Sequence, residues 1–216
     1  AMTIDMTQVD FWDRAADSKT FTHPLNLAPL AEFLAPDATL LDYGCGQGRL
    51  CGQLKVAGYS NLSGVDFSPA MIAKARHSFP DIAFEVLNES GLPIPASTVD
   101  CVLLFAVLTC IPDDSAQLAV VEELERVLKP GGILYLSDYL FQSDARNIER
   151  YARNASNVGA YGTFVTDDGA FVRHHSGEWI AELFAGFQQI ESHHVEIATM
   201  NGHRSSCFQC VLRKLG

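Results

Sequence analysis

Short apolar runs alternate with helix-like segments over the first two thirds of the chain. One run, VDCVLLFAVL at 99–108, is apolar almost throughout, which is typical of a strand buried on both faces of a sheet. The other strand-like runs lie at 39–44, 62–68, 82–88 and 132–139. Helical candidates lie between them at 48–58, 69–79 and 115–128. Strands and helices that alternate in this way predict an α/β fold with a doubly wound, mostly parallel sheet.

The end of the chain breaks this alternation. A helix is predicted over 176–185, with Ser176 as its N-cap and Gly186 at its end. Two strand-like segments follow, at 188–200 and 205–215, with only a short loop between them. Because a short loop joins antiparallel neighbours, we expect a C-terminal antiparallel hairpin.

Two segments lie outside the alternating pattern. The N-terminal segment 1–30 is amphipathic, and the segment 140–175 holds a polar helical piece and a hairpin signal at Asp168-Gly169. Both segments can pack over the carboxyl ends of the strands, where open α/β sheets bind ligands. We therefore predict one domain over 1–216 with an N-terminal lid and an inserted lid. Ordinary surface decoration is the alternative interpretation of these two segments.

Composition and charge narrow the class of partner. The chain has 216 residues, of which 48% are hydrophobic and 19% charged, enough for one substantial core. Its net charge of −11 disfavours nucleic acid and an anionic membrane surface as partners. No run of apolar residues is long enough to span a bilayer, and the N-terminal segment lacks the pattern of a signal peptide. We expect a cytoplasmic protein with a small-molecule partner; the sequence does not indicate an oligomeric state.

Cys207 and Cys210 form a CxxC pair inside a predicted strand. Positions three apart in a strand point to opposite faces, and the chain has no second such pair. We therefore expect packing thiols and no metal site.

A glycine-rich loop follows the first predicted strand directly. The loop reads GCGQGR at 44–49 and leads into a helix, whose free N–H groups face the same place. The glycines allow a tight turn and close approach of a ligand to the backbone. Asp66 ends the next strand, twenty residues after Gly46, where an acidic residue can accept both hydroxyls of a ribose. This arrangement predicts a cofactor of the adenosine type.

Two departures from the dinucleotide pattern decide which cofactor is expected. The pattern GxGxxG requires a third glycine at the position that Arg49 occupies. Asp42 stands two residues before the first glycine, where a carboxylate would repel a pyrophosphate. The same carboxylate suits a cofactor with an amino group and a sulfonium. Both departures favour S-adenosylmethionine over NAD.

Four segments resemble, in order, the motifs of the class I S-adenosylmethionine-dependent methyltransferases. The first motif is similar to LLDYGCGQGRL and the second to GVDFSPAMIAKAR. The segment spanning the fourth strand is similar to LPIPASTVDCVLLFAVLTCIPD, and the one entering the fifth strand to LERVLKPGGILYLSD. The resemblance covers 36–138 and implies a Rossmann-like fold, S-adenosylmethionine as cofactor and methyl transfer as the reaction.

The resemblance also implies which residues contact the cofactor. These positions are Asp42, Gly44, Cys45, Gly46, Asp66, Phe67, Met71, Asn88, Glu89 and Phe105. The backbone of Gly44 and Gly46 would meet the methionine moiety, and Asp66 would hold the ribose diol. Phe67 and Met71 would flank the adenine, and Phe105 would lie along the methionine arm.

One position departs from the family pattern. The family usually has an aspartate after the third strand, which contacts the adenine amine. Here Asn88 stands at that position, with Glu89 next to it. The side-chain carbonyl of an asparagine can still accept a hydrogen bond from the amine.

The acceptor side is less clearly marked. His23 in the N-terminal segment, Tyr139 after the fifth strand, and Tyr161 and His174 in the inserted segment are candidate substrate contacts. We assign no catalytic residue, because an in-line methyl transfer needs a general base only when the nucleophile arrives protonated. Transfer to a small-molecule acceptor is the leading interpretation. A protein methyltransferase with an open groove, or a non-catalytic module that binds S-adenosylmethionine, are the alternatives.

Overall fold

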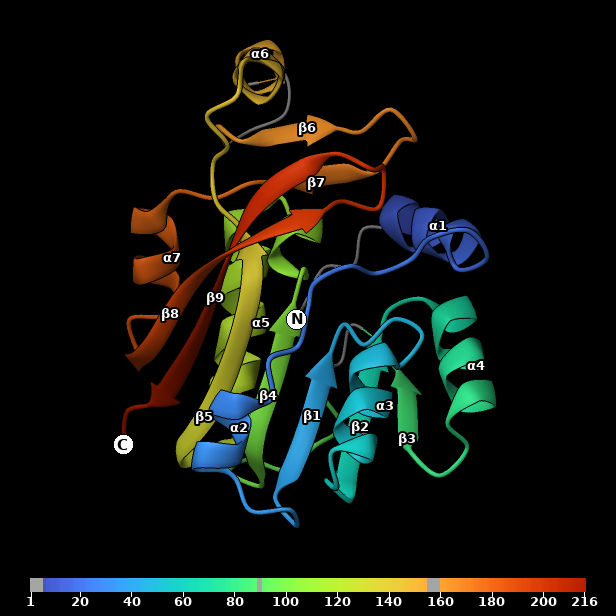
Figure 1. Ribbon diagram of the computed structural model, residues 1–216, viewed down its shortest axis with the longest axis vertical. Coiled ribbons are helices and arrows are strands. Elements are labelled where there is room, and N and C mark those ends of the chain that lie inside the picture. Colours follow the sequence, from blue (N-terminus) through green and yellow to red (C-terminus); the bar gives the residue numbers. More distant parts are fainter. Residues whose placement is uncertain (1–5, 89–90, 155–159) are drawn as a thin grey trace.

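Seven strands form one sheet at the centre of the computed structural model, in the order β3-β2-β1-β4-β5-β9-β8 (Figure 1). The structure describes residues 6–88, 91–154 and 160–216. The strands are β1 (Thr39–Tyr43), β2 (Asn61–Asp66), β3 (Ala83–Val86), β4 (Val99–Phe105), β5 (Leu128–Tyr139), β8 (Phe187–Ala198) and β9 (Arg204–Lys214). β1 to β5 run parallel, whereas β9 is antiparallel to β5 and to β8. The predicted doubly wound sheet and its C-terminal antiparallel hairpin are confirmed.

Helices cover both faces of this sheet. They are α2 (Ala28–Phe33), α3 (Arg49–Val56), α4 (Pro69–Ser78), α5 (Asp114–Val127) and α7 (Gly177–Leu183). Leu124 of α5 and Leu183 of α7 pack with strand residues in one core cluster, and Leu30 of α2 and Leu54 of α3 pack in a second. Ser176 accepts a hydrogen bond from the backbone N–H of Trp179 at 3.0 Å, which confirms it as the N-cap of α7.

The fourth strand is shorter than its apolar run predicts. β4 ends at Phe105, and Ala106 adopts a φ of +55°, so the chain turns away from the sheet. The backbone N–H of Ala106 donates to the carbonyl of Ser137 at the end of β5, 2.7 Å away. A short 3-10 turn, Leu108–Cys110, follows. The run stays apolar past the strand because Leu108 is fully buried in the same core cluster.

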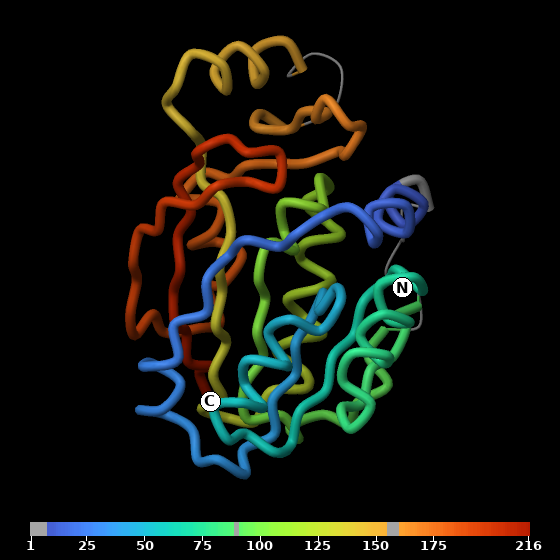
Figure 2. The backbone as a smooth tube through the Cα atoms, turned by 45° about the vertical axis from the view of Figure 1, so that its right-hand side comes forward, coloured from blue at the N-terminus to red at the C-terminus, as the bar shows by residue number. Residues whose placement is uncertain are grey.

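Four elements lie outside the central sheet and its helices. They are α1 (Met6–Ala15), α6 (Ala145–Asn154), β6 (Thr163–Val165) and β7 (Phe171–Arg173). β6 and β7 form a separate antiparallel pair, which confirms the hairpin predicted at Asp168-Gly169. All four gather beyond the carboxyl ends of the parallel strands, together with the turn between β8 and β9 (Figures 1 and 2). Part of the inserted segment, 155–159, lies outside the described residues.

The two cysteines of the CxxC pair lie on opposite faces of β9. Cys210 belongs to the core cluster under α5, whereas Cys207 lies 3.8 Å from Nε2 of His23 on the other face. Both thiols are free and buried, and the described residues hold no group of ligands suited to a metal ion. Among the same residues, no helix has the length and apolar character that a bilayer crossing requires.

Candidate active site

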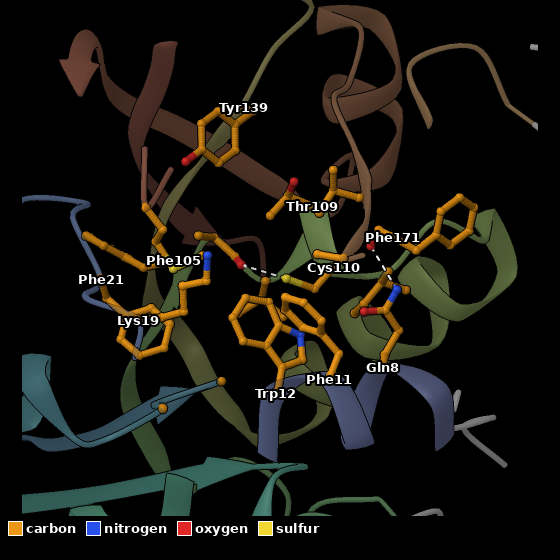
Figure 3. Close-up of a pocket in the computed structure, with 18 of the residues that line it drawn as sticks. Gln8, Phe11, Trp12, Lys19, Phe21, Phe105, Thr109, Cys110, Tyr139 and Phe171 are labelled. Carbon is orange, nitrogen blue, oxygen red and sulfur yellow. Dashed lines mark hydrogen bonds between the residues drawn. The ribbon is translucent and has the colours of Figure 1, made fainter. Parts of the chain in front are cut away.

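A cavity of about 810 Å³ lies beyond the carboxyl ends of β1, β2, β4 and β5 (Figure 3). The glycine loop and the ends of these strands line one side of it. The N-terminal segment, the inserted segment and the β8–β9 turn line the other side. Phe11 and Trp12 point from α1 into this space, and Phe105 and Cys110 face it from the strand side.

The glycine loop has a backbone that only glycine accommodates easily. Gly44 and Gly46 have φ angles of +75° and +51°. A Cβ at Gly44 would lie 2.5 Å from Cγ2 of Val107, and one at Gly46 would lie 3.0 Å from Cε2 of Phe21. The backbone N–H groups of Gly44 and Cys45 donate to the carbonyl of Val65, so the loop is held against the end of β2. Gly44 and Gly46 both line the cavity, with the side chains of Val107 and Phe21 packed close against them.

Asp66 joins the end of β2 to the glycine loop. One carboxylate oxygen accepts from the N–H of Gly46 and the other from the N–H of Ser68, both at 2.9 Å. Burial raises the pKa of Asp66, although these N–H groups act in the opposite direction. Each oxygen keeps a further lone pair, and the residue lines the cavity. The geometry fits a carboxylate that accepts hydrogen bonds from a ligand diol.

Asp42 is a second carboxylate in the same cavity. It is 2% exposed, and burial raises its pKa to about 7 although the nearby Arg49 guanidinium lowers it. Its hydrogen-bond partner is the thiol of Cys51, whose Sγ lies 3.8 Å from a carboxylate oxygen. Arg49 instead donates to the backbone carbonyl of His23 at 2.6 Å, which ties the N-terminal segment to α3. A ligand cation at Asp42 would stabilise its ionised form.

Most of the residues predicted for the cofactor line this cavity. They are Asp42, Gly44, Cys45, Gly46, Asp66, Phe67, Met71 and Phe105. Asn88 is exposed and is not among the lining residues, and Glu89 lies outside the described residues. The glycine backbone, the carboxylate of Asp66 and the buried Asp42 fit the ribose and the methionine moiety of S-adenosylmethionine.

Three of the four acceptor-side candidates line the cavity together. The ring of Tyr139 stacks on His174 at 5.0 Å and meets His23 edge to face, also at 5.0 Å. Tyr161 is not part of the lining; it is 49% exposed and its ring packs on Phe141 and Tyr151. The sequence does not reveal that Tyr161 packs on Tyr151, which in turn contacts His174.

Both histidines of this group are held neutral. Burial lowers the pKa of His23 to about 4 and that of His174 to about 3. Nδ1 of His23 lies 2.9 Å from Oγ of Ser137, and Nδ1 of His174 lies 2.6 Å from the hydroxyl of Tyr151. Neutral imidazoles with such low pKa values are weak bases, so these side chains are better suited to shape and hydrogen bonding than to proton abstraction.

Several lining residues were not singled out from the sequence. They include Gln8, Lys19, Phe21, Thr109, Arg146, Arg150, Phe164, Phe171 and Asn201. They come from four separate segments, and no spacing in the sequence connects one segment with another. Gln8 donates to the backbone carbonyl of Phe171 at 2.9 Å, a contact that joins α1 to β7 (Figure 3).

Lys19, Asp168 and Asn201 connect the three segments that border the outer side of the cavity. The Lys19 ammonium pairs with Asp168 and donates to Oδ1 of Asn201 at 2.6 Å. Nδ2 of Asn201 donates to Asp168 at 3.3 Å. Burial opposes ionisation of Asp168, yet hydrogen bonds from Lys19, Thr166 and Asn201 hold its pKa at about 2. We call these three residues the outer cluster.

Comparison with known proteins finds methyltransferases, which agrees with a cavity suited to S-adenosylmethionine. The family model described as "Methyltransferase domain" matches residues 41–136. A trans-aconitate 2-methyltransferase of Methylobacterium nodulans is 36% identical over 123 residues, covering 55% of this chain and 46% of that protein. An EEF1A lysine methyltransferase 4 of Mus musculus is 30% identical, covering 58% of each. The chain spans about half the length of the curated relatives it matches.

A solved structure has the same fold over nearly its full length. It is an S-adenosylmethionine-dependent methyltransferase from Methanosarcina mazei, with a TM-score of 0.83 and 24% sequence identity. The match covers 89% of this chain and 99% of that one. The domain match over residues 41–136 and the similar methyltransferase sequences support a class I S-adenosylmethionine-dependent methyltransferase, and the solved structure shares its fold.

Proposed function

We propose that this chain transfers a methyl group from S-adenosylmethionine to a small-molecule acceptor bound in the same cavity. The observation that carries the proposal is the cavity itself, because one space holds the glycine loop with Asp66 on one side and Tyr139 on the other. The N-terminal and inserted segments border this space from outside, which suits a small acceptor better than a protein chain. Relatives named for trans-aconitate and for 27-O-demethylrifamycin SV support the same class of acceptor.

Some residues of the chain would hold the cofactor, and others would exclude water from the cavity. Bound S-adenosylmethionine supplies a methyl group on a sulfonium, which is already activated toward a nucleophile. Asp66 would accept from the ribose hydroxyls, and Asp42 would face the ammonium of the methionine moiety. Aromatic residues of the cavity would exclude water and hold the acceptor in line; among them are Phe11, Trp12, Phe21, Phe105, Tyr139, Phe164 and Phe171.

Calorimetry with S-adenosylmethionine tests the first half of this proposal. Binding to the whole chain is expected, and its absence would refute the function. The second half is tested by incubation with labelled cofactor and panels of small acceptors, peptides and intact proteins. Label transfer to a small molecule supports the proposal, whereas transfer only to a protein would identify a protein methyltransferase. Cofactor binding with no transfer to any panel would indicate a non-catalytic binding module.

We also propose that segments 1–30 and 140–175 act as lids over this cavity, joined by the outer cluster. Opening would then require the separation of Lys19 from Asp168. Such a partly buried ion pair contributes up to about 1 kcal/mol.

Replacing Lys19 with alanine is expected to speed release of bound cofactor about two- to fivefold, because the lids would open more often. Stopped-flow fluorescence of Trp12, which lines the cavity, would follow release of S-adenosylhomocysteine. Lys55→Ala is the matched control, since Lys55 pairs with Asp81 at 3.0 Å on an exposed surface away from the cavity lining. An unchanged release rate in Lys19→Ala would mean that the outer cluster does not hold the lids.

A further inference from the structure

Helix α6 presents two arginines to the cavity. Arg146 and Arg150 both line it, and their spacing of four residues places them on one face of the helix. Arg153 belongs to a different face, where it pairs with Glu149 at 2.5 Å. In the described part of the chain, neither Arg146 nor Arg150 takes part in an ion pair. Two positive charges therefore border the cavity, and no carboxylate of residues 6–88, 91–154 or 160–216 forms an ion pair with either.

Arg150 is held in place without being neutralised. Its guanidinium lies 4.2 Å above the ring centroid of Phe164, and Nη1 donates to Oδ1 of Asn147 at 3.2 Å. Asn147 is in turn fixed by a hydrogen bond to Asp144 at 2.6 Å. An arginine has five N–H donors in a rigid fork, so most of the donors of Arg150 stay available to a ligand. A fixed fork of this kind matches the geometry of an oxyanion.

The electrostatics of Arg150 also favour an anion. Burial lowers the pKa of Arg150, and the charge of Arg146 lowers it further. Asp144 and Asp167 act in the opposite direction from a longer range, since neither forms an ion pair with it in the described residues. An anion between the two guanidinium groups would relieve their mutual repulsion.

The other cations at the cavity are already engaged. Lys19 is paired with Asp168 in the outer cluster, and Arg49 is held against the carbonyl of His23 beside Asp42. The remaining lining near α6 and α1 is largely apolar and includes Phe11, Trp12, Phe164, Phe171 and Val172. This region combines an apolar wall with one positively charged end.

We propose that Arg146 and Arg150 bind an oxyanion, a carboxylate or a phosphate, carried by an otherwise apolar acceptor. Both arginines line the cavity from α6, a helix that lies well beyond the carboxyl ends of the parallel strands (Figures 1 and 2). The inference rests on the proposed function and adds the chemical class of the acceptor. The anionic group anchors the acceptor at these arginines, and the atom that receives the methyl group lies nearer to Tyr139.

The test compares acids with their neutral analogues on the whole chain saturated with S-adenosylhomocysteine. The probes are benzoate, cinnamate and decanoate, the amide of each, and phenyl phosphate. Calorimetry is expected to show at least one acid binding about tenfold more tightly than its amide, or phenyl phosphate binding about tenfold more tightly than benzamide. The better of the two anion types identifies the source of the oxyanion. If no probe is bound in preference to its amide, or none is bound at all, the inference is wrong.

Variants test whether the two arginines cause the preference for an anion over its neutral amide. Arg146→Gln and Arg150→Gln are each expected to weaken binding of the preferred anion by roughly fivefold or more, with amide binding unchanged. Arg150→Lys keeps the charge and should retain part of the preference. Arg153→Gln is the matched control, because Arg153 lies on the same helix but does not line the cavity. Equal losses in Arg153→Gln, or no loss in the first two variants, would overturn the assignment.

The proposed function can fail separately from this inference. If S-adenosylhomocysteine itself does not bind the wild-type chain, the methyltransferase proposal is refuted before any acceptor probe is added. If it binds and the anion preference is absent, only the oxyanion site is refuted. Unchanged affinity for S-adenosylhomocysteine in the Arg146 and Arg150 variants excludes loss of folding as the cause of weaker anion binding.

Discussion

Replacing Asp66 with alanine is expected to weaken binding of S-adenosylmethionine by about 1–3 kcal/mol, roughly five- to 150-fold in the dissociation constant. The variant loses the carboxylate that would accept from the ribose hydroxyls. It also leaves the N–H groups of Gly46 and Ser68 without their acceptor, so the glycine loop loses one of its contacts with the end of β2, while the bonds of Gly44 and Cys45 to Val65 remain. Isothermal titration calorimetry at fixed pH measures the change directly.

Two further variants separate the causes of this loss. Asp66→Asn removes the charge but keeps one side-chain oxygen as an acceptor, so an intermediate affinity is expected. Asp81→Ala removes an exposed carboxylate whose only described ion pair is with Lys55, and it should bind the cofactor as the wild type does. Wild-type affinity in Asp66→Ala would mean that the ribose assignment is wrong. An equal loss in Asp81→Ala would point to a general effect of charge.

The strands of the sheet could be predicted because each forms a recognisable apolar run in the sequence. β4 is buried along almost its whole length, and its unbroken apolar run identifies it without knowledge of its neighbours. The run overestimates the strand at one end, because Leu108 is buried after the chain has left the sheet. Hydrophobicity reports burial, whereas the end of β4 depends on the positive φ of Ala106, which the apolar pattern does not encode.

The cofactor side of the cavity was predictable for a related reason. Gly44, Gly46 and Asp66 lie close in the sequence, and their roles depend on one strand, one turn and the next strand. The acceptor side depends instead on how distant segments pack. The contact of Lys19 with Asp168 spans 149 residues, and no local pattern predicts it.

The face that α6 turns to the cavity illustrates the same limit. From the sequence this segment is a polar helical piece, with charged residues on several sides. Tyr151 and Asn147 are buried, and their packing decides that Arg146 and Arg150 line the cavity while Arg153 does not. Tyr161 was predicted to contact substrate, but it does not line the cavity; its ring packs on Tyr151, which in turn contacts His174. Packing of this kind follows from the assembled fold and not from residue spacing.

The affinity for S-adenosylmethionine is expected to fall about tenfold between about pH 8 and about pH 6, because Asp42 becomes protonated. Burial raises the pKa of Asp42 to about 7. Above this pKa the carboxylate is ionised and attracts the ammonium of the cofactor; below it the attraction is lost. Roughly nine-tenths of the side chain is ionised one unit above the pKa and one-tenth one unit below, which gives the tenfold ratio.

Two variants isolate this effect from other titrations. Asp42→Asn should bind more weakly at every pH and should lose the dependence, apart from any contribution of the ligand's own amine. Asp138→Asn is the matched control: burial raises the pKa of Asp138 to about 7 as well, but the residue accepts backbone N–H groups and does not line the cavity. His23 and His174 stay neutral throughout this range and add nothing to the change. If Asp42→Asn keeps the wild-type pH dependence, the group that titrates is not Asp42, and the ammonium must be held elsewhere in the loop.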